Sequence, residues 1–298
     1  MPRRLGVLLN PTSGRGRVAR HCDDVLRGLA RRGDRVVVIE EPTAAAARAA
    51  LATALADGLD AVVAVGGDGT VHMALQAVAG TDVALGIVPM GSGNDAARSL
   101  GIPQHPARAL GTVLDGVAVA VDTGTVTAPD ATLTHFLCIL TTGFDSLVND
   151  RANRMTWPPG QSRYVVAMLA ELRTFRPRAY RMVVDGEQRD EPAMIVSLGN
   201  GPAYGGGMRL CPTADLHDGQ LSMVWMSPLS RPALLRAFPR VYAGTHLAHP
   251  AIHERSVREV VLDAPGLVAY ADGERIGPLP ITVRAAPGAV RVLVPADR

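Results

Sequence analysis

Lysine is absent from the sequence: all 30 basic residues among its 298 positions are arginines. Any cationic side chain that contacts a phosphate must therefore be a guanidinium group, and mechanisms that need a catalytic lysine, including the P-loop and protein-kinase types, are excluded. The 28 acidic residues nearly balance the arginines, which are scattered along the chain. This distribution gives no indication of a nucleic-acid-binding face.

Cysteines and long apolar runs are also scarce. The three cysteines, Cys22, Cys138 and Cys211, lie far apart without metal-ligand spacing, so we expect reduced packing residues of a cytoplasmic protein. No uninterrupted apolar stretch approaches about 18 residues, so no transmembrane helix is predicted. The apolar run at residues 5–9 is too short for a signal peptide. The apolar content of 47% nevertheless suffices for a packed core.

The first 122 residues alternate between short apolar segments and helical patterns, which is typical of a parallel α/β sheet. We expect strands at residues 5–9, 35–40, 62–65 and 83–88, and helices at residues 18–31, 43–57, 72–79 and 94–100. Parallel strands deliver the loops that follow them to one edge of the sheet, where α/β proteins place their ligands. We therefore predict a Rossmann-like α/β lobe over residues 1–122 with a ligand site at that edge.

Three of the four strands end in small, polar, glycine-bearing loops. They read Asn10-Pro11-Thr12-Ser13-Gly14-Arg15-Gly16, Gly66-Gly67-Asp68-Gly69-Thr70 and Pro89-Met90-Gly91-Ser92-Gly93-Asn94-Asp95. Glycines let a polyanion lie against backbone N–H groups, and the amino end of a helix adds a favourable field for phosphate. The same residues also build ordinary strand-to-helix turns, so each loop alone has both interpretations.

Asp68 does not match a simple phosphate loop, because its carboxylate repels a phosphate unless a cation lies between them. It therefore suggests Mg²⁺-dependent nucleotide chemistry. The alternative is that Asp68 is a capping residue of the turn. Likewise, Asn94 and Asp95 fit either ligand contacts or the capping position and first turn of the following helix.

Residues 123–298 change character and predict a second, mostly antiparallel β domain. Expected strands cover residues 134–141, 181–184, 194–198, 220–226, 259–262, 268–271, 281–284 and 290–294, with helices at 162–175 and 231–242. The first of these helices is unusually apolar, through Arg163, Tyr164, Val165, Val166, Met168, Leu169 and Leu172. It fits packing on a sheet or contact with lipid, and the Trp157-Pro158-Pro159-Gly160 segment fits a membrane-facing aromatic or a rigid loop.

The three loops in this order resemble the diacylglycerol kinase catalytic domain family, which includes bacterial lipid kinases and the sphingosine and ceramide kinases. The similarity continues through Gly143-Phe144-Asp145, Asn200 with Gly205-Gly206-Gly207, Pro212 to Gly219, and Asp272-Gly273-Glu274. Although the GGDGT loop alone is shared with NAD kinases and phosphofructokinase-like folds, the ordered set is specific and spans nearly the whole chain.

The resemblance implies a phosphofructokinase-like and NAD kinase-like first lobe that binds ATP and a β-sandwich second lobe, with the nucleotide in the cleft between them. The last strand is expected to return to the first lobe. The ATP-binding residues implied are Asn10, Pro11, Thr12, Ser13, Gly14, Arg15, Thr43, Gly66, Gly67, Asp68, Gly69, Thr70, Gly91, Ser92, Asn94 and Asp95. Many relatives carry lysine where Arg15 stands.

The resemblance also implies the chemistry. Glu274 matches the proton acceptor of the family, and Asp68 and Asp272 complete the catalytic set. Asp215, Leu216 and Asp218 match a Mg²⁺-holding segment, from which His217 departs because some relatives have an acidic residue there. Asp145 matches a contact to the lipid acceptor or caps a turn, and Arg15 or Arg209 would neutralise phosphate charge. On residue pattern alone, the Asp272-Gly273-Glu274 segment is a solvated hairpin turn.

We therefore expect an ATP- and Mg²⁺-dependent lipid kinase of phospholipid biosynthesis that converts diacylglycerol to phosphatidic acid. Its expected location is the inner face of the cell membrane, as a peripheral protein without a nucleic-acid partner, and a homodimer is a further hypothesis. The alternatives are a sphingoid-base or ceramide-type kinase, an NAD kinase, and a nucleotide-binding regulatory protein without turnover.

Overall fold

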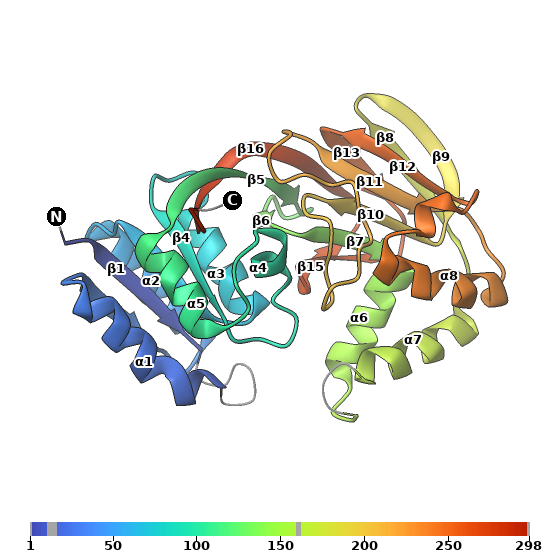
Figure 1. Cartoon of the computed structure of the whole chain (residues 1–298). Coiled ribbons are helices and arrows are strands. Elements are labelled where there is room, and N and C mark those ends of the chain that lie inside the picture. Colours follow the sequence, from blue (N-terminus) through green and yellow to red (C-terminus); the bar gives the residue numbers. More distant parts are fainter. Residues whose placement is uncertain (1, 11–16, 159–161, 297–298) are drawn as a thin grey trace. The chain divides into compact units, whose positions relative to one another are not determined.

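The computed structural model describes residues 2–10, 17–158 and 162–296 (Figure 1). The chain divides into two compact units. Unit 1 contains Met1–Asp122 and Gly288–Arg298, and unit 2 contains Thr123–Pro287. Two strands, β5 (Val117–Thr127) and β16 (Ile281–Val294), carry the chain from one unit into the other. Unit 1 is therefore built from two segments of sequence that are separated by the whole of unit 2.

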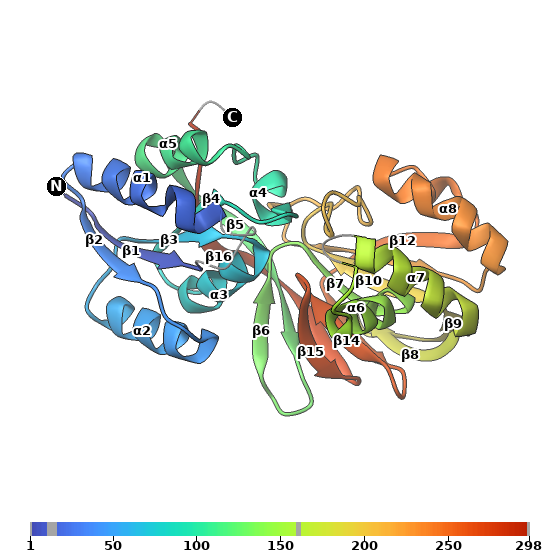
Figure 2. The same cartoon turned by 90° about the horizontal axis from the view of Figure 1, so that it is seen from below.

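Unit 1 is a parallel sheet in the order β2-β1-β3-β4-β16. Its strands are β1 (Arg4–Leu9), β2 (Arg35–Ile39), β3 (Ala61–Gly66), β4 (Ala84–Pro89) and the carboxyl-terminal part of β16, which pairs in parallel with β4. The helices α1 (Arg17–Arg31) and α5 (Pro106–Asp115) cover one face, and α2 (Ala44–Ala56) and α3 (Asp68–Val78) cover the other (Figure 2). This confirms the predicted parallel α/β lobe.

The strands β3 and β4 are fully buried along their length, which explains their continuous apolar sequences. The predicted start of the following helix at residue 72 is wrong, because α3 begins at Asp68 and includes most of the GGDGT segment. Gly67 occupies the N-cap position in an extended conformation. The connection between β3 and α3 is consequently a single residue, and this short turn fixes Asp68 in the first turn of the helix.

Unit 2 is a sandwich of two antiparallel layers, as predicted. One layer is a six-stranded sheet in the order β12-β11-β10-β7-β14-β15, and the other contains the amino-terminal part of β16 with β13, β8 and β9, together with β5 and β6. Bulky residues of both layers, among them Tyr180, Leu198, Leu221 and Val260, form the buried core. The bounds are β6 (Leu133–Phe136), β7 (Ile139–Gly143), β8 (Arg178–Val184), β9 (Glu187–Ala193), β10 (Ile195–Gly199), β11 (Leu221–Met226), β12 (Ile252–Val257), β13 (Glu259–Asp263), β14 (Val268–Ala271) and β15 (Glu274–Pro278).

Several elements of unit 2 differ from the sequence prediction. The strand expected at residues 134–141 is two strands, β6 and β7, whereas the strands expected at 281–284 and 290–294 are one continuous strand, β16. Strands β5, β9, β12 and β15 and helix α6 (Phe144–Arg154) were not predicted, nor was α5 in unit 1. The expected helices at 162–175 and 231–242 are present as α7 (Ser162–Thr174) and α8 (Arg231–Ala243).

The aromatic residues are distributed unequally between the units. Both tryptophans, all five tyrosines and all four phenylalanines of the chain belong to unit 2, and unit 1 contains no residue of these three types. The core of unit 1 is therefore purely aliphatic. Among the described residues, no helix is both long and apolar enough to cross a bilayer.

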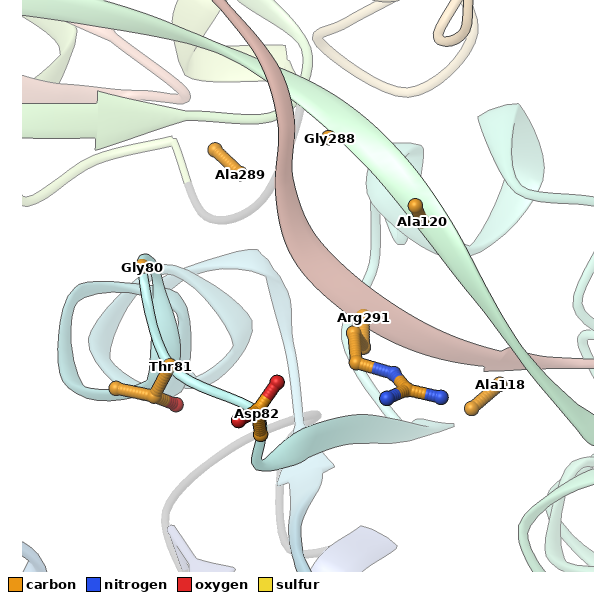
Figure 3. A pocket seen from close by; sticks show the side chains of 8 residues that line it. All are labelled: Gly80, Thr81, Asp82, Ala118, Ala120, Gly288, Ala289 and Arg291. Atoms are coloured by element: carbon orange, nitrogen blue, oxygen red, sulfur yellow. The ribbon is translucent and has the colours of Figure 1, made fainter.

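Unit 1 also contains a pocket of about 510 Å³ beside the turn that precedes β4 (Figure 3). Asp82 and Arg291 are its charged lining residues. Because the pocket lies at the amino-terminal end of β4, it is at the edge of the sheet opposite to the three predicted loops. None of the residues predicted for the site lines it.

Candidate active site

The carboxyl ends of β1, β3 and β4 meet at one edge of the unit 1 sheet, as the sequence predicts. Leu9 pairs with Val65, and Gly66 pairs with Pro89, so the three strands end in register. Asn10 follows β1 directly and is exposed. The residues Pro11, Thr12, Ser13, Gly14 and Arg15 lie outside the described residues, so their predicted contacts stay predictions.

The loops after β3 and β4 touch each other through glycine backbones. A Cβ atom added to Gly91 would lie 2.6 Å from the Cα of Gly67, and one added to Gly67 would lie 3.2 Å from the Cα of Gly91. In addition, the Met90 N–H donates to the Gly66 carbonyl at 2.7 Å. Any side chain at Gly67 or Gly91 would force the loops apart. The predicted glycines thus create a close pair of backbones beside the amino end of α3, which suits a polyanion.

Asp68 holds the loop after β4 in place. Its two carboxylate oxygens accept hydrogen bonds from the Asn94 N–H at 2.8 Å and the Asp95 N–H at 2.7 Å. These N–H groups begin the short helix α4 (Asp95–Ser99), so Asp68, in the first turn of α3, caps a different helix. Asp68 therefore joins two of the predicted loops directly.

Asn94 does not cap α4 with its side chain, which corrects that interpretation of the sequence. Its backbone is left-handed, with a φ of 54°, and its side-chain oxygen accepts a hydrogen bond from the Gly91 N–H at 2.8 Å. Asn94 therefore closes the Gly91-Ser92-Gly93 turn. The capping of α4 passes to Asp68, which sequence spacing could not indicate because Asp68 lies 26 positions earlier.

Burial, followed by the negative charge of Asp95, raises the pKa of Asp68 to about 6, although the N–H groups of Asn94, Asp95 and Ala96 act to lower it. Asp95 is itself only 6% exposed. Two carboxyl groups thus lie together at this edge of the sheet. A nearby cation would favour the ionised form of both, which is consistent with the Mg²⁺ chemistry predicted from Asp68.

The other predicted ATP residues of unit 1 are distributed around these loops. Thr43 follows β2 at the same edge of the sheet and is the N-cap of α2, where its hydroxyl accepts a hydrogen bond from the Ala46 N–H at 3.2 Å. Ser92 and Gly69 are exposed, while Thr70 is buried with its hydroxyl against Gly66. Thr70 therefore supports the turn from within.

In unit 2, Asp272-Gly273 forms the two-residue turn between β14 and β15, with φ angles of 50° and 86°. This confirms the predicted hairpin. A simple solvated turn would leave the Asp272 carboxylate in water, but here it is bound by the protein. Its carboxylate accepts hydrogen bonds from the N–H groups of Leu137 at 2.7 Å, Cys138 at 2.9 Å and Ile139 at 3.1 Å. Asp272 therefore ties the β14–β15 turn to the break between β6 and β7, and its predicted catalytic role stays a prediction.

Glu274 stands on the other side of that turn and differs sharply from Asp272. Its side chain is exposed at the first position of β15, and no hydrogen bond or ion pair holds it within the described part of the chain. The three hydrogen bonds to the Asp272 carboxylate fix the backbone two residues before Glu274. Glu274 thus combines a fixed backbone position with a free carboxylate, which a proton acceptor needs.

Asp145 lies in the first turn of α6, next to Gly143, whose positive φ of 84° makes the sharp turn out of β7. The Thr141 and Tyr204 hydroxyls and the Asn149 amide donate hydrogen bonds to its carboxylate, the last at 3.2 Å. Burial raises the pKa of Asp145, and the hydroxyl bonds oppose that shift. Sequence reasoning missed Thr141 and Tyr204, although Tyr204 directly precedes the Gly205-Gly206-Gly207 run.

The predicted metal segment offers hard oxygen donors. Asp215 and Asp218 are exposed, and one carboxylate oxygen of each accepts a hydrogen bond within its own turn, from His217 N–H and Gln220 N–H respectively. No group of three or more His, Cys, Asp or Glu side chains in the described ranges could hold a metal ion by itself. The donor set fits Mg²⁺, which commonly takes one or two carboxylates and completes its shell with carbonyl, water and phosphate oxygens.

Arg209 is the remaining predicted phosphate clamp of unit 2. It is exposed, and its backbone N–H donates to the Val241 carbonyl at 3.0 Å, which ties it to the end of α8. Its guanidinium forms no ion pair with any described residue, so its charge is available to a ligand. The other predicted clamp, Arg15, is one of the residues outside the described ranges.

Comparison with known families and structures agrees with this geometry. Residues 4–126 match the diacylglycerol kinase catalytic domain, and residues 138–294 match the YegS C-terminal NAD kinase beta sandwich-like domain. A diacylglycerol kinase of Mycobacterium tuberculosis is 43% identical over 291 residues, which cover 97% of this chain and 94% of that protein. The lipid kinase YegS of Escherichia coli K12 is 29% identical over 80% of each chain.

A solved structure also shares the fold. A diacylglycerol kinase from Bacillus anthracis str. Sterne superposes with a TM-score of 0.72 at 19% sequence identity, over 98% of this chain and 97% of that one. Both units are included in that coverage. With two family models matched in sequence order and a relative of 43% identity along nearly its full length, this chain belongs to the diacylglycerol kinase catalytic domain family and is an enzyme of the lipid kinase class.

Proposed function

We propose that the protein transfers the γ-phosphate of ATP to the free hydroxyl of diacylglycerol and releases phosphatidic acid and ADP. The observation that carries this proposal is the 43% identity to a protein named diacylglycerol kinase over 97% of the chain. That similarity includes both the unit with the glycine loops and the unit with Glu274. The joint presence of both units supports transfer chemistry over simple nucleotide binding.

Unit 1 would bind ATP at the edge formed by the ends of β1, β3 and β4. The absence of side chains at Gly67 and Gly91 lets the two loops pack against each other beside the amino end of α3, which provides a favourable field for phosphate. Because unit 1 contains no aromatic residue, its own contacts to the adenine ring are aliphatic or polar. Asp68 keeps the two glycine loops together and does not itself need to accept a proton.

In the reaction, the lipid hydroxyl oxygen forms a bond to the γ-phosphorus while the bond between that phosphorus and the β,γ-bridging oxygen breaks. The hydroxyl proton would pass to the Glu274 carboxylate, which is free of other partners among the described residues. Asp145, held by Thr141 and Tyr204, would orient the glycerol end of the acceptor. Asp215, Asp218 and the Leu216 carbonyl would hold Mg²⁺, which supplies charge neutralisation when bound.

The direct test is an assay of the purified protein with Mg-ATP and a panel of diacylglycerols, sphingoid bases, ceramides and NAD, each presented separately. We expect label transfer to diacylglycerol and its near loss in Glu274→Gln, with unchanged ATP binding. Phosphorylation of NAD without any lipid product would contradict the proposal. If the wild-type protein and Glu274→Gln both bind ATP and neither shows turnover, the protein is instead a regulatory nucleotide-binding protein.

A second lipid acceptor is the closest competing function. It is favoured by the similarity to the Escherichia coli lipid kinase YegS, whose name specifies a lipid but no acceptor. In that case the same Glu274-dependent transfer would occur, but sphingoid base, ceramide or another lipid hydroxyl in the panel would take the label. The ranking of kcat/KM values across the panel decides between the two.

A further inference from the structure

Helix α6 is attached to the outer face of the six-stranded sheet of unit 2. Along β7 and β14, Leu140, Ala269 and Ala271 belong to the core of the sandwich, so the alternate residues point away from that core. Those alternate residues include Thr141 and Tyr270, which pair with each other across the two strands. Their side chains therefore lie next to each other on the face of the sheet that α6 contacts (Figures 1 and 2).

The hydroxyl groups of both residues hold α6. The Thr141 hydroxyl donates to Asp145 in the first turn of the helix. The Tyr270 hydroxyl donates to the Asp150 carboxylate at 3.0 Å, and its oxygen accepts a hydrogen bond from the Asn153 side chain. Because residues 150 and 153 are one helical turn apart, Tyr270 holds a single side of the helix. Helix α6 is thus attached at its start and again about 8 to 12 Å further along its axis.

The second of these attachments is shielded from solvent. Tyr270 is only 2% exposed, and the Asp150 side chain is 24% exposed, with Arg154 paired to its other carboxylate oxygen at 2.6 Å. Burial, followed by the hydrogen bond to Asp150 and the charge of that carboxylate, raises the pKa of Tyr270. The hydroxyl therefore keeps its proton at neutral pH and stays the donor. A hydrogen bond from a hydroxyl to a carboxylate is stronger than one between neutral groups.

Tyr270 also belongs to the hairpin that carries the proposed proton acceptor. It pairs with Arg275 of β15, and Glu274 is the residue next to Arg275. The helix that Tyr270 holds carries Asp145, the proposed lipid contact, in its first turn. One tyrosine hydroxyl therefore links the hairpin of Glu274 to the helix of Asp145, and all of these residues belong to unit 2.

We propose that Tyr270 is a positioning residue for the lipid substrate, because its hydrogen bonds to α6 set the separation between Asp145 and Glu274. The inference rests on the proposed lipid kinase function, in which Asp145 orients the glycerol end of the lipid and Glu274 accepts its hydroxyl proton. A single attachment leaves the helix free to pivot, whereas two attachments fix its direction. A misplacement of about 1 Å in a reacting group can cost about a hundredfold in rate, so the second attachment matters for transfer.

The first test is Tyr270→Phe, which removes the hydroxyl and keeps the ring. We expect kcat/KM for diacylglycerol in mixed micelles to fall about tenfold, because the lipid contact and the proton acceptor lose their fixed separation. The KM for ATP should change by less than about twofold, since the glycine loops of unit 1 are untouched. A loss that appears in the KM for ATP and not in kcat/KM for the lipid would contradict the proposal.

The matched control is Tyr180→Phe, which also removes a buried tyrosine hydroxyl bond from unit 2. Tyr180 is 1% exposed, and its hydroxyl is bonded to the Thr142 hydroxyl at 3.0 Å. That bond lies between the two layers of the sandwich, on the face of β7 that points away from α6. Tyr180→Phe should keep kcat/KM for the lipid within about twofold of wild type. Equal losses in the two variants would reduce the effect of Tyr270→Phe to general destabilisation and overturn the proposal.

Changes at Asp150 separate the hydrogen bond from the charge. Asp150→Asn keeps an oxygen that accepts from the Tyr270 hydroxyl, so kcat/KM should stay within about threefold of wild type. Asp150→Ala removes the acceptor and should lower kcat/KM nearly as much as Tyr270→Phe, and the variant with both changes should be no slower than Tyr270→Phe alone. Losses that multiply in the double variant would show that the two groups act independently. These variants keep the buried ring, so they carry the test if Tyr270→Phe folds poorly.

Arg154→Gln is the control for the outer ion pair of Asp150. The Arg154 side chain is 78% exposed, and the variant leaves the Tyr270 bond in place. We expect kcat/KM to stay within about twofold of wild type, because exposed ion pairs contribute little. If Arg154→Gln instead lowers kcat/KM as far as Asp150→Ala, the charge pair and not the tyrosine positions the helix, and the proposal fails.

Hydrogen exchange tests the attachment without any kinase activity. The backbone amides of residues 144–154 should exchange at least about threefold faster in Tyr270→Phe than in wild type, and at the wild-type rate in Tyr180→Phe. Unchanged exchange of α6 in Tyr270→Phe would overturn the proposal. If α6 responds as expected but wild type phosphorylates no lipid, the proposed function fails and only the attachment stands. If wild type is an active lipid kinase and Tyr270→Phe keeps its full kcat/KM, the positioning proposal fails and the kinase proposal survives.

Discussion

Asp68 shows how one carboxylate can set the geometry of two loops. Each of its oxygens accepts one backbone N–H of the segment that starts α4. An asparagine at this position keeps one acceptor oxygen but points an NH₂ group at the second N–H. One hydrogen bond is then replaced by two opposed donors. The position therefore requires a carboxylate for a structural reason that is separate from any contact to Mg²⁺.

We expect Asp68→Asn to lower kcat by about 100-fold or more, because displacement of the Gly91 loop by a fraction of an ångström misaligns the phosphates. The measurement is steady-state kinetics on the preferred lipid, with ATP affinity determined in parallel. Val117→Ala, which alters an exposed side chain of unit 1 outside the predicted ATP residues, is the control and should change kcat far less. An Asp68→Asn enzyme with full activity would refute this model of the loops.

The raised pKa of Asp68 predicts a pH dependence of stability. The group has a pKa of about 6 in the folded protein and an ordinary value of 3.8, so the folded state binds its proton more tightly. The stabilisation is complete below pH 3.8 and is lost as the pH rises through 6. Relative to wild type, the free energy of unfolding of Asp68→Asn should therefore increase by about 2 kcal/mol between pH 4 and pH 7.5.

Urea unfolding of both proteins at the two pH values measures this difference, and the titrating groups that do not interact with Asp68 cancel in the comparison. A constant difference between wild type and variant across this range would mean that Asp68 keeps its ordinary pKa. The sign is informative as well, since a carboxylate stabilised mainly by its N–H partners would give the opposite trend.

At the scale of elements, the turn between β14 and β15 separates a hydrogen-bonded carboxylate, Asp272, from an exposed one, Glu274, for which we propose the catalytic role. Asp272 accepts three backbone N–H groups from residues 137–139, while Glu274 faces solvent. Asn200 binds the same break, through its side-chain amide to the Leu137 carbonyl at 2.9 Å. The break between β6 and β7 is thus held from two sides by segments distant in sequence.

We expect Asp272→Ala to lower the free energy of unfolding by about 2–4 kcal/mol, because three N–H groups lose their acceptor. Glu274→Gln should change stability by less than about 0.5 kcal/mol and should reduce kcat by a factor of about 100 or more. Denaturation and steady-state kinetics on the two variants check both effects. Equal losses of stability in the two variants would remove the distinction between their roles.

The sequence predicts an element well when its own residues determine it. The buried strands β3 and β4 were found from continuous apolar runs, and the loops at their ends from their glycines. In contrast, β9 is polar along most of its length and is held by pairing with β8, which no local pattern reveals. The break at residues 137–138 was missed because it depends on Asp272, 135 positions later.

The same distinction applies to the candidate site. Asp68, Asp145 and Glu274 could be singled out from motifs, since the glycines beside them mark special turns. Their partners could not, because Tyr204 reaches Asp145 and Asn94 reaches Asp68 only through the folded chain. The three N–H partners of Asp272 were missed for the same reason, because they lie in another part of the sandwich, and its catalytic role stays a prediction.

At the scale of the whole molecule, the unequal distribution of aromatic residues makes the two units distinguishable by spectroscopy. Tryptophan fluorescence reports on unit 2 alone, whereas far-ultraviolet circular dichroism reports on both units. Because β5 and β16 are continuous strands that belong to both units, unfolding of either unit removes strands from the other. The two signals should therefore follow one cooperative transition.

Mg-ATP at 100 times its Kd should raise the free energy of unfolding by about 2.7 kcal/mol, and this shift should appear equally in fluorescence and in circular dichroism. The measurement is urea unfolding with both probes, with and without the nucleotide. A nucleotide without phosphates, adenosine, serves as the control and should give a much smaller shift. If ATP moves only the circular dichroism transition, the two units unfold independently.

The return of β16 to unit 1 has a consequence for synthesis on the ribosome. The strand β4 is fully buried in the finished protein, but its neighbour at residues 291–292 is made only after the whole of unit 2. At translation rates of about 5–20 residues per second, β4 remains an uncovered apolar strand edge for roughly 10 to 40 seconds. The nascent chain therefore carries an aggregation-prone edge during this interval, and shielding by a ribosome-associated chaperone would matter more for this protein than its final stability suggests.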